Sequence, residues 1–166
     1  MNPVVARLSK LHDKAKREAL SADERDEYKK LCDDLCRILL IAQDLGHQGK
    51  TLRAALRVAS VLKVRLDFGG AQAITTSTID LSEGGFAVVL DATQRVGHLV
   101  LFTLSLPALV GEGSHSINGT VRVASSRQQG SHFRVSFTFT DVSPDDHDYL
   151  GAIIMDMILA RYSAKG

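Results

Sequence analysis

The stretch RVASVLKVRLDF, residues 57–68, decides the fold because the spacing of the apolar side chains changes at its start. Upstream of it, apolar residues recur every three or four positions, which is the period of a helix buried on one side. From Val58 to Phe68, every second residue except Ser60 is apolar, which is the period of a β-strand with one buried face. Residue 57 therefore marks the boundary between a helical part and a β part.

The helical part carries two starting signals. Asn2 followed by Pro3 is typical of a helix start, because the asparagine side chain can accept from a free N–H and proline lacks one. Ser21 and Glu24 have the spacing of a capping box at the start of a second helix. That helix should end near two glycines, so residues 3 to 45 are predicted to form an antiparallel helical hairpin. Its second helix has an apolar seam made of Tyr28, Leu31, Leu35, Ile38, Ala42 and Leu45.

The β part contains six strand candidates separated by turn-forming residues. They span residues 57–68, 73–80, 85–91, 97–106, 115–126 and 131–140. Short connections without intervening helices favour antiparallel pairing and a barrel. Ser143 followed by Pro144 then starts a third helix, which should lie on an open end or face of the barrel. The predicted fold class is mainly β with helical additions: an N-terminal helical hairpin, a six-stranded antiparallel β-barrel and a C-terminal helix.

Charge and composition restrict the classes of function. The formal charge of +1 at pH 7 argues against a protein that coats a nucleic-acid polymer, although it is compatible with a small anionic ligand. The chain has no apolar run of about 18 residues and no signal segment at its start, so membrane insertion is not expected. Cys32 and Cys36 are the only cysteines, which favours a reducing compartment. We therefore predict a cytoplasmic protein.

Two short motifs carry the prediction of function. Arg53 and Arg57 form Arg-x-x-x-Arg at the entrance to the first strand candidate. After a further 22 residues, Asp80, Ser82 and Gly85 form Asp-x-Ser-x-x-Gly at the end of the second. This pair of motifs resembles the PilZ family of cyclic di-GMP receptors, in which the first motif leads into a barrel and the second lies at a nearby strand end. The resemblance covers residues 52 to about 163.

The chemistry of these residue types suits the ligand that the resemblance implies. Cyclic di-GMP carries two phosphates and two guanines, and an arginine guanidinium can grip a phosphate or the guanine O6/N7 edge with two parallel hydrogen bonds. Asp80 would accept from the guanine N–H donors, and Ser82 would add a small donor. Gly85 would let the backbone approach the ligand closely. The candidate binding residues are therefore Arg53, Arg57, Asp80, Ser82 and Gly85.

Each motif also has a plain structural interpretation. The arginines could be solvated or could pair with Asp44 or Asp67, and the second motif could be a hairpin turn in which glycine takes a positive φ.

The two cysteines lie four residues apart without a further ligand at zinc-finger spacing, so a packed apolar pair is expected. The histidines form no cluster. We predict no catalytic set, no metal site and no cofactor, and hence no enzyme.

The resemblance implies two parts, residues 1–48 as an accessory helical hairpin and residues 49–166 as a PilZ-like barrel with its C-terminal helix. The main hypothesis is a receptor that transmits cyclic di-GMP binding by ordering residues 50–57 against the turn at 80–85 and moving the hairpin. The alternative is a PilZ-like module that does not bind the ligand and serves protein–protein interaction or oligomerisation. It would bind an unknown protein partner, or form a homodimer through the N-terminal helices, because the four consecutive apolar residues at 38–41 exceed what one hairpin face needs.

Overall fold

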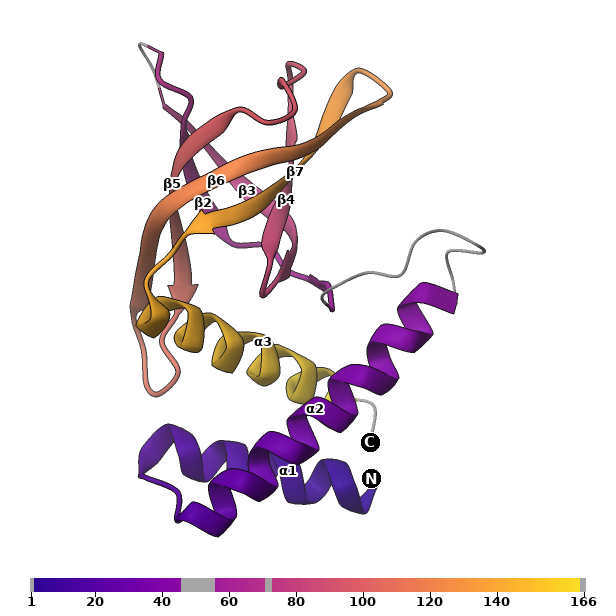
Figure 1. The fold of residues 1–166 in the computed structure, drawn as a ribbon, viewed down its shortest axis with the longest axis vertical. Helices are drawn as coiled ribbons and strands as arrows, with labels where there is room; N and C mark the ends of the chain where they lie inside the picture. The colour runs from indigo at the N-terminus through magenta and orange to yellow at the C-terminus, as the bar shows by residue number, and fades with distance from the viewer. Residues whose placement is uncertain (1, 46–55, 71–72, 165–166) are drawn as a thin grey trace.

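The computed structural model describes residues 2–45, 56–70 and 73–164, arranged in three layers (Figure 1). A β-barrel forms the first layer, helix α3 lies across its open end, and the hairpin of α1 and α2 packs on the other side of α3. The helices are α1 (Pro3–Arg17), α2 (Ala22–Leu45) and α3 (Pro144–Ala164). The strands are β1 (Val58–Ala59), β2 (Lys63–Asp67), β3 (Ile74–Ser82), β4 (Gly85–Leu90), β5 (Leu99–Pro107), β6 (Ser114–Gln129) and β7 (His132–Asp141).

The predicted six-stranded antiparallel barrel is confirmed. Strands β3, β2, β5, β6, β7 and β4 pair in that order, and an additional β3–β4 pairing closes the ring, with β1 attached outside it along β3. Alternate residues of each strand fill the interior, as in β7, where Val135 and Phe137 are buried. The rings of Phe86 and Phe137 lie 5.3 Å apart between their centroids at the centre of this core.

The first strand candidate is broken in two, which corrects the prediction of one strand over residues 57–68. Ala59 pairs with Asp80, and Lys63 pairs with Ser77. The chain therefore advances four residues from position 59 to 63 while β3 advances three from 80 to 77, and this mismatch is a β-bulge. The Thr78 hydroxyl spans the break, because it donates to the Ser60 carbonyl oxygen at 2.7 Å and accepts from the Leu62 N–H at 3.0 Å. The Thr78 side chain thus adds two hydrogen bonds at the break to the backbone bonds from the Ser60 N–H to the Ile79 carbonyl oxygen and from the Thr78 N–H to the Leu62 carbonyl oxygen.

Helix α3 joins the barrel to the hairpin. The Ser143 hydroxyl accepts from the Asp146 N–H at 3.1 Å, which confirms the predicted cap. The Tyr149 hydroxyl donates to the Pro107 carbonyl oxygen at 2.8 Å and so attaches α3 to the end of β5. Because α3 is covered from both sides, it buries residues around most of its circumference: Leu150, Ile153, Ile154, Met155, Ile158 and Leu159.

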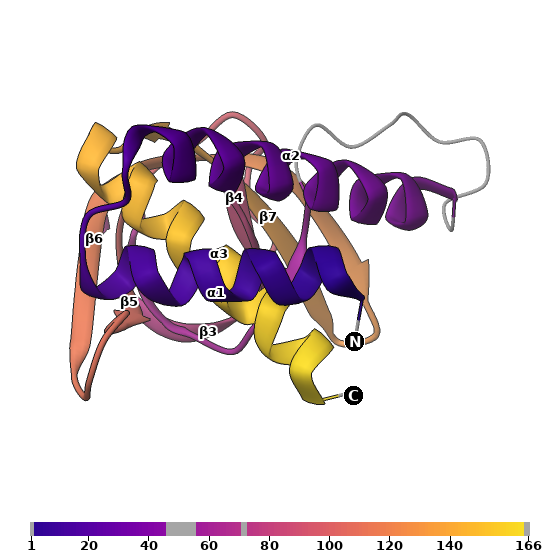
Figure 2. The same cartoon turned by 90° about the horizontal axis from the view of Figure 1, so that it is seen from below.

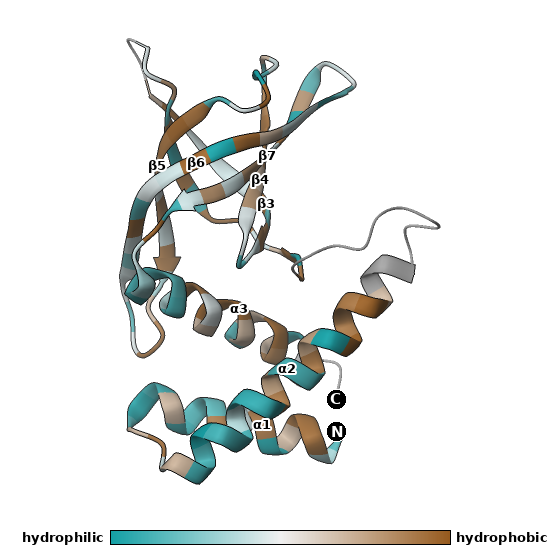
Figure 3. Cartoon of the chain, in the orientation of Figure 1, coloured by the Kyte–Doolittle hydropathy of each residue, from teal (hydrophilic) through white to brown (hydrophobic). Residues whose placement is uncertain are grey.

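The helical hairpin is confirmed, and Figure 2 shows its two helices running side by side in opposite directions beneath α3. The Glu24 N–H donates to the Ser21 hydroxyl at 3.2 Å and the Ser21 N–H to the Glu24 carboxylate at 3.0 Å, as a capping box requires. The predicted seam of α2 is wrong in its second half, where Ile38 is 64% exposed. Helix α1 is much shorter than α2, so the apolar end of α2 extends beyond it (Figure 3).

A buried histidine connects the three helices. His12 is only 2% exposed, and its Nε2 lies 3.1 Å from the Asp156 carboxylate of α3. A carboxylate can only accept, so Nε2 carries the proton and Nδ1 accepts from the Tyr28 hydroxyl of α2 at 2.8 Å. Burial lowers the pKa of His12, an effect that Asp156 only partly offsets. Burial alone would raise the pKa of Asp156, but hydrogen bonds from Lys16 and His12 lower it.

This histidine should make the fold sensitive to mild acid. The unfolded chain binds a proton at His12 near its ordinary pKa of 6.5, whereas the folded chain binds it only at lower pH. We therefore expect the free energy of unfolding to fall as the pH drops from about 7.5 to about 5.5, and His12→Gln to flatten that dependence. Urea unfolding across this range measures it, with the exposed His147→Gln as control. An unchanged slope in His12→Gln would contradict the assignment.

The two cysteines pack as expected from the sequence. Cys32 and Cys36 are half-buried on the side of α2 that faces α3. Burial raises the pKa of the Cys32 thiol to about 12 and also raises that of Cys36. Both side chains are therefore protonated at neutral pH and act as small apolar groups.

Candidate functional site

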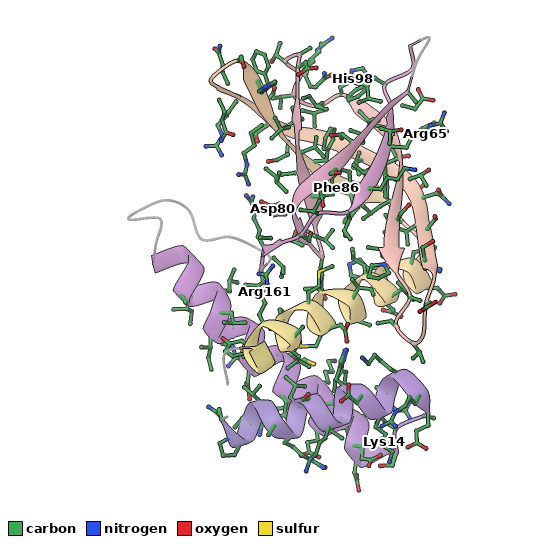
Figure 4. The ribbon with its side chains drawn as sticks, turned by 180° about the vertical axis from the view of Figure 1, so that it is seen from behind. Lys14, Arg65, Asp80, Phe86, His98 and Arg161 are labelled. Atoms are coloured by element: carbon green, nitrogen blue, oxygen red, sulfur yellow. The ribbon has the colours of Figure 1, made fainter. Side chains whose placement is uncertain are left out.

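A cavity of about 250 Å³ lies on the outer face of the barrel, next to the turn between β3 and β4. The pairing of Val58 with Leu81 brings the start of β1 to the end of β3, and thereby places Arg57 at this turn. Figure 4 shows Asp80 at the end of the barrel nearest α3, with Arg161 of α3 close by. The cavity is lined by Arg57, Asp80, Ser82, Gly84, Gly85, Phe86, Ala124, Ser136, Phe137 and Thr138.

Four of the five residues singled out from the sequence line this one cavity. Arg57, Asp80, Ser82 and Gly85 come from the start of β1, the end of β3 and the start of β4. Arg53, and with it residues 50–55 of the segment expected to become ordered on binding, lie outside the described residues. The cavity thus combines a cation, a carboxylate and a hydroxyl-bearing turn within one concave surface.

The Ser82 hydroxyl organises the turn. It accepts from the N–H groups of Gly84 and Gly85, each at 3.2 Å, and lies 3.3 Å from the Gly85 carbonyl oxygen, to which it donates. Ser82 is buried, with 9% of its surface exposed. Its hydrogen-bonding capacity is therefore largely satisfied within the turn, as the alternative interpretation of the motif expected.

The fold itself requires glycine at position 85, for a reason that the sequence did not reveal. Gly85 pairs with Thr138 on β7, and a Cβ atom added to it would lie 1.8 Å from the Phe137 carbonyl oxygen. Its φ is not positive, so conformational freedom is not the reason. The backbone of β7 approaches Gly85 too closely for a side chain.

Asp80 forms an ion pair that the sequence did not reveal. Its Oδ2 accepts from Nη2 of Arg134 on β7 at 2.6 Å, and the two side chains are 16% and 25% exposed. The two residues are separated by 54 positions in the chain. Only the register that places β4 between β3 and β7 brings them together.

Arg57 also lines a second cavity, of about 340 Å³, between the barrel and the helices. Its other walls are Leu39 and Ala42 of α2, Leu56, Val58, and Ile158, Arg161 and Tyr162 of α3. Arg161 donates to the Ala59 carbonyl oxygen of β1, which ties the end of α3 to the strand that Arg57 precedes. Arg57 therefore stands between the candidate site and the helical layer.

The turn at the site also meets the helices through Glu83. A Cβ atom added to Gly151 of α3 would lie 3.0 Å from Oε1 of Glu83, so the glutamate lies against this helix. Glu83 lines a third cavity, of about 780 Å³, together with Tyr28, Cys32 and Cys36 of α2 and Met155 of α3. The candidate site is thus connected to the helices at two residues, Arg57 and Glu83.

Two kinds of feature are absent from the described part of the chain. Within residues 2–45, 56–70 and 73–164, no group of three or more His, Cys, Asp or Glu side chains could hold a metal ion. Among the described helices, none combines the length and the apolar character needed to cross a membrane.

Comparison with known proteins gives a family and a fold. The family model for the PilZ domain matches residues 51–156. A search of curated proteins found no match. The structure resembles that of the inhibitor of motility MotI/DgrA from Bacillus subtilis, with a TM-score of 0.57 and 19% identity, over 69% of this chain and 53% of that one.

Two further similar structures come from Escherichia coli. One is YcgR in complex with c-di-GMP, with a TM-score of 0.55 and 21% identity, covering 68% of this chain and 49% of that one. The other is the PilZ domain of YcgR with c-di-GMP, with a TM-score of 0.52 and 19% identity, covering 69% and 98%. The chain spans about half the length of MotI/DgrA and of YcgR. At these identities the likeness concerns the fold.

Proposed function

The chain belongs to the PilZ domain family, and we propose that it is a receptor for cyclic di-GMP that binds its ligand beside the β3–β4 turn. The observation that carries the proposal is the meeting of Arg57, Asp80 and the Ser82–Gly85 turn at one cavity. Similar structures that contain c-di-GMP support it. In this role the protein recognises its ligand and carries out no reaction on it.

The residues of the cavity complement the ligand's charges. Arg57 offers a planar set of donors to a phosphate or to the guanine O6/N7 edge, and Arg53 supplies a second set four residues earlier. Asp80 accepts from the N1–H and 2-amino groups on the Watson–Crick edge of one guanine. A volume of about 250 Å³ is below the roughly 300 to 1,000 Å³ usual for ligand pockets, so the cavity holds one base and the rest of the ligand lies outside it.

The expected affinity follows from a few strong hydrogen bonds. Hydrogen bonds to charged groups contribute about 1.5 to 3 kcal/mol each, and a micromolar dissociation constant requires about 8 kcal/mol. Four or five such bonds, less the cost of ordering the arginine segment, reach that value. Titration calorimetry of the purified protein with cyclic di-GMP should therefore give a Kd in the micromolar range or below. Absence of a binding heat at several temperatures would refute the receptor assignment.

We further propose that binding is transmitted to the helical layer, with residues 1–48 and 49–166 as the two parts that respond. Arg57 is shared by the site and the cavity that α2 and α3 line, so a movement of Arg57 toward a ligand changes the packing of both helices. Glu83 offers a second connection between the turn and α3.

Hydrogen exchange tests this transmission. On addition of cyclic di-GMP we expect slower exchange at residues 56–59 and 80–85, together with a change in the last turns of α3 and the second half of α2. Strand β5, none of whose residues lines either cavity that Arg57 lines, is the internal control. Protection confined to the turn and β1, with both helices unchanged, would leave a receptor without this transmission.

A second function is favoured by the surface of α2. Ile38 and Ile41 are 64% and 53% exposed, whereas Leu39 and Leu40 are half-buried and line cavities. Exposed apolar side chains one turn apart on a protruding helix suit contact with a protein partner or a second copy of the chain. Mass measurement with and without cyclic di-GMP separates the two functions, because a module that only associates forms its complex regardless of the ligand.

A further inference from the structure

Arg134 and Asp80 meet across an intervening strand. Asp80 on β3 pairs with Ala87 on β4, and Arg134 on β7 pairs with Val89 on the same strand. The short side chain of Ala87, which is 1% exposed, lies beneath the bridge that the ion pair makes. The guanidinium therefore reaches diagonally over β4, and its Nη2 comes within 2.6 Å of the Asp80 Oδ2.

This ion pair leaves part of the Asp80 carboxylate for a ligand. A carboxylate has about four acceptor positions, and the contact with Nη2 uses one of them. Asp80 itself lines the cavity, whereas Arg134 does not. The arginine, which does not line the cavity, thus holds a carboxylate that does.

The pair is unsuited to being broken when a ligand binds. The Arg134 Nε is buried and has no hydrogen-bond partner among the described residues, so Asp80 is the counterpart that compensates this cation. Removing one member of a largely buried ion pair leaves an uncompensated charge, which is strongly unfavourable. A ligand that displaced Arg134 from Asp80 would create that situation, whereas a ligand that used the remaining acceptor positions would not.

We propose that Arg134 is a positioning residue that sets the base specificity of the site. It fixes the Asp80 carboxylate so that its remaining acceptor positions receive the N1–H and 2-amino donors of a guanine. This inference rests on the proposed function and assigns it a selectivity. Adenine presents an acceptor at N1 and no 2-amino group, and hypoxanthine lacks only the 2-amino group. A fixed carboxylate discriminates among the three bases, while a mobile one adapts or turns away.

The test compares three cyclic dinucleotides that carry guanine, hypoxanthine or adenine. Calorimetry of the wild type should show cyclic di-GMP binding at least about tenfold more tightly than the hypoxanthine analogue, since a hydrogen bond to a charged group is lost. In Arg134→Met this ratio should fall to within about threefold, and in Asp80→Ala it should fall equally. The double variant should be no worse than Asp80→Ala, because both residues act through one carboxylate.

Arg127→Met is the matched control. Arg127 lies directly opposite Arg134 on β6, is exposed, and has the same charge and length. If Arg134 acted only by attracting an anionic ligand, both variants would weaken all three dinucleotides alike without changing their ratio. We expect Arg127→Met to keep the wild-type ratio and Arg134→Met to lose it.

The outcomes are separable. If the wild type binds none of the dinucleotides, the proposed function fails and the inference fails with it. If the wild type binds cyclic di-GMP and Arg134→Met retains the full ratio, only the inference fails. Tighter binding by Arg134→Met would also overturn it, because Arg134 would then compete with the base. Should Arg134→Met melt below the titration temperature, the same ratio is measured in Arg134→Gln and decides in the same way.

Discussion

Gly85→Ala is expected to lower the free energy of unfolding by at least about 3 kcal/mol. The new Cβ atom would lie 1.8 Å from the Phe137 carbonyl oxygen and 3.2 Å from the Thr138 Cα, and both belong to the backbone of β7. Neither can move aside as a flexible side chain would, so the pairing of β4 with β7 must open at that point. For a chain of this length, the loss corresponds to a decrease in Tm of about 6 to 12 °C.

Two glycine variants serve as comparisons. In Gly119→Ala the Cβ atom would lie 1.9 Å from the Asp141 carbonyl oxygen, so a similar loss of stability is expected at a position outside the candidate site. Gly70→Ala has nothing within 4 Å of its Cβ atom and should melt as the wild type does. Thermal unfolding of the three variants measures this. Equal Tm values for Gly85→Ala and Gly70→Ala would contradict the close approach of β7.

Arg57→Ala is expected to weaken cyclic di-GMP binding by at least about tenfold, which corresponds to 1.4 kcal/mol. The variant removes a bidentate, charge-assisted contact and leaves a ligand phosphate or guanine edge without its partner. Arg57→Lys should recover only part of the affinity, because an ammonium cannot reproduce the planar fork. Calorimetry measures both variants, and circular dichroism verifies that their fold is retained.

Arg65→Ala is the control for this variant. Arg65 is an exposed arginine of β2 that lines a different cavity, and Figure 4 shows it on the side of the barrel away from Asp80. The Arg65→Ala substitution removes the same charge without changing the candidate site, so we expect less than about a twofold change in the Kd for cyclic di-GMP. Equal losses in Arg57→Ala and Arg65→Ala would mean that general charge, and not a specific contact, attracts the ligand.

The sequence predicted the order and kind of elements well, because periodicity and caps are local signals. The capping box at Ser21 and the proline start at Ser143 are satisfied by residues within one turn. The break between β1 and β2 was missed, since it depends on the hydroxyl of Thr78 in another strand. The exposed Ile38 was also missed, because helical period shows which residues share a face but not where the covering helix ends.

The candidate site was predictable to the extent that its residues lie within motifs. Spacing identified Arg57 and Asp80, and the structure places both at one cavity. The spacing of the motifs gave no indication of Arg134, because strand register across β3, β4 and β7 determines which side chains become neighbours. A lone charged residue in an otherwise alternating strand was the one available signal. The structural reason for glycine at position 85 could not be predicted either, since it depends on the backbone at Phe137 of β7, 52 residues later in the chain.

The attachment of β1 outside the closed ring has an evolutionary consequence. The six strands from Lys63 to Asp141 close without it, and β1 is held by two residue pairs with β3, by the Thr78 hydroxyl and by Arg161 of α3. A gene fusion ahead of Lys63 would leave the barrel intact but exchange the segment that carries Arg57. The segment that carries Arg57 and the barrel that carries Asp80 and Ser82 are therefore encoded by adjacent stretches of DNA, and recombination at this one junction would separate the proposed arginine contact from the rest of the proposed site.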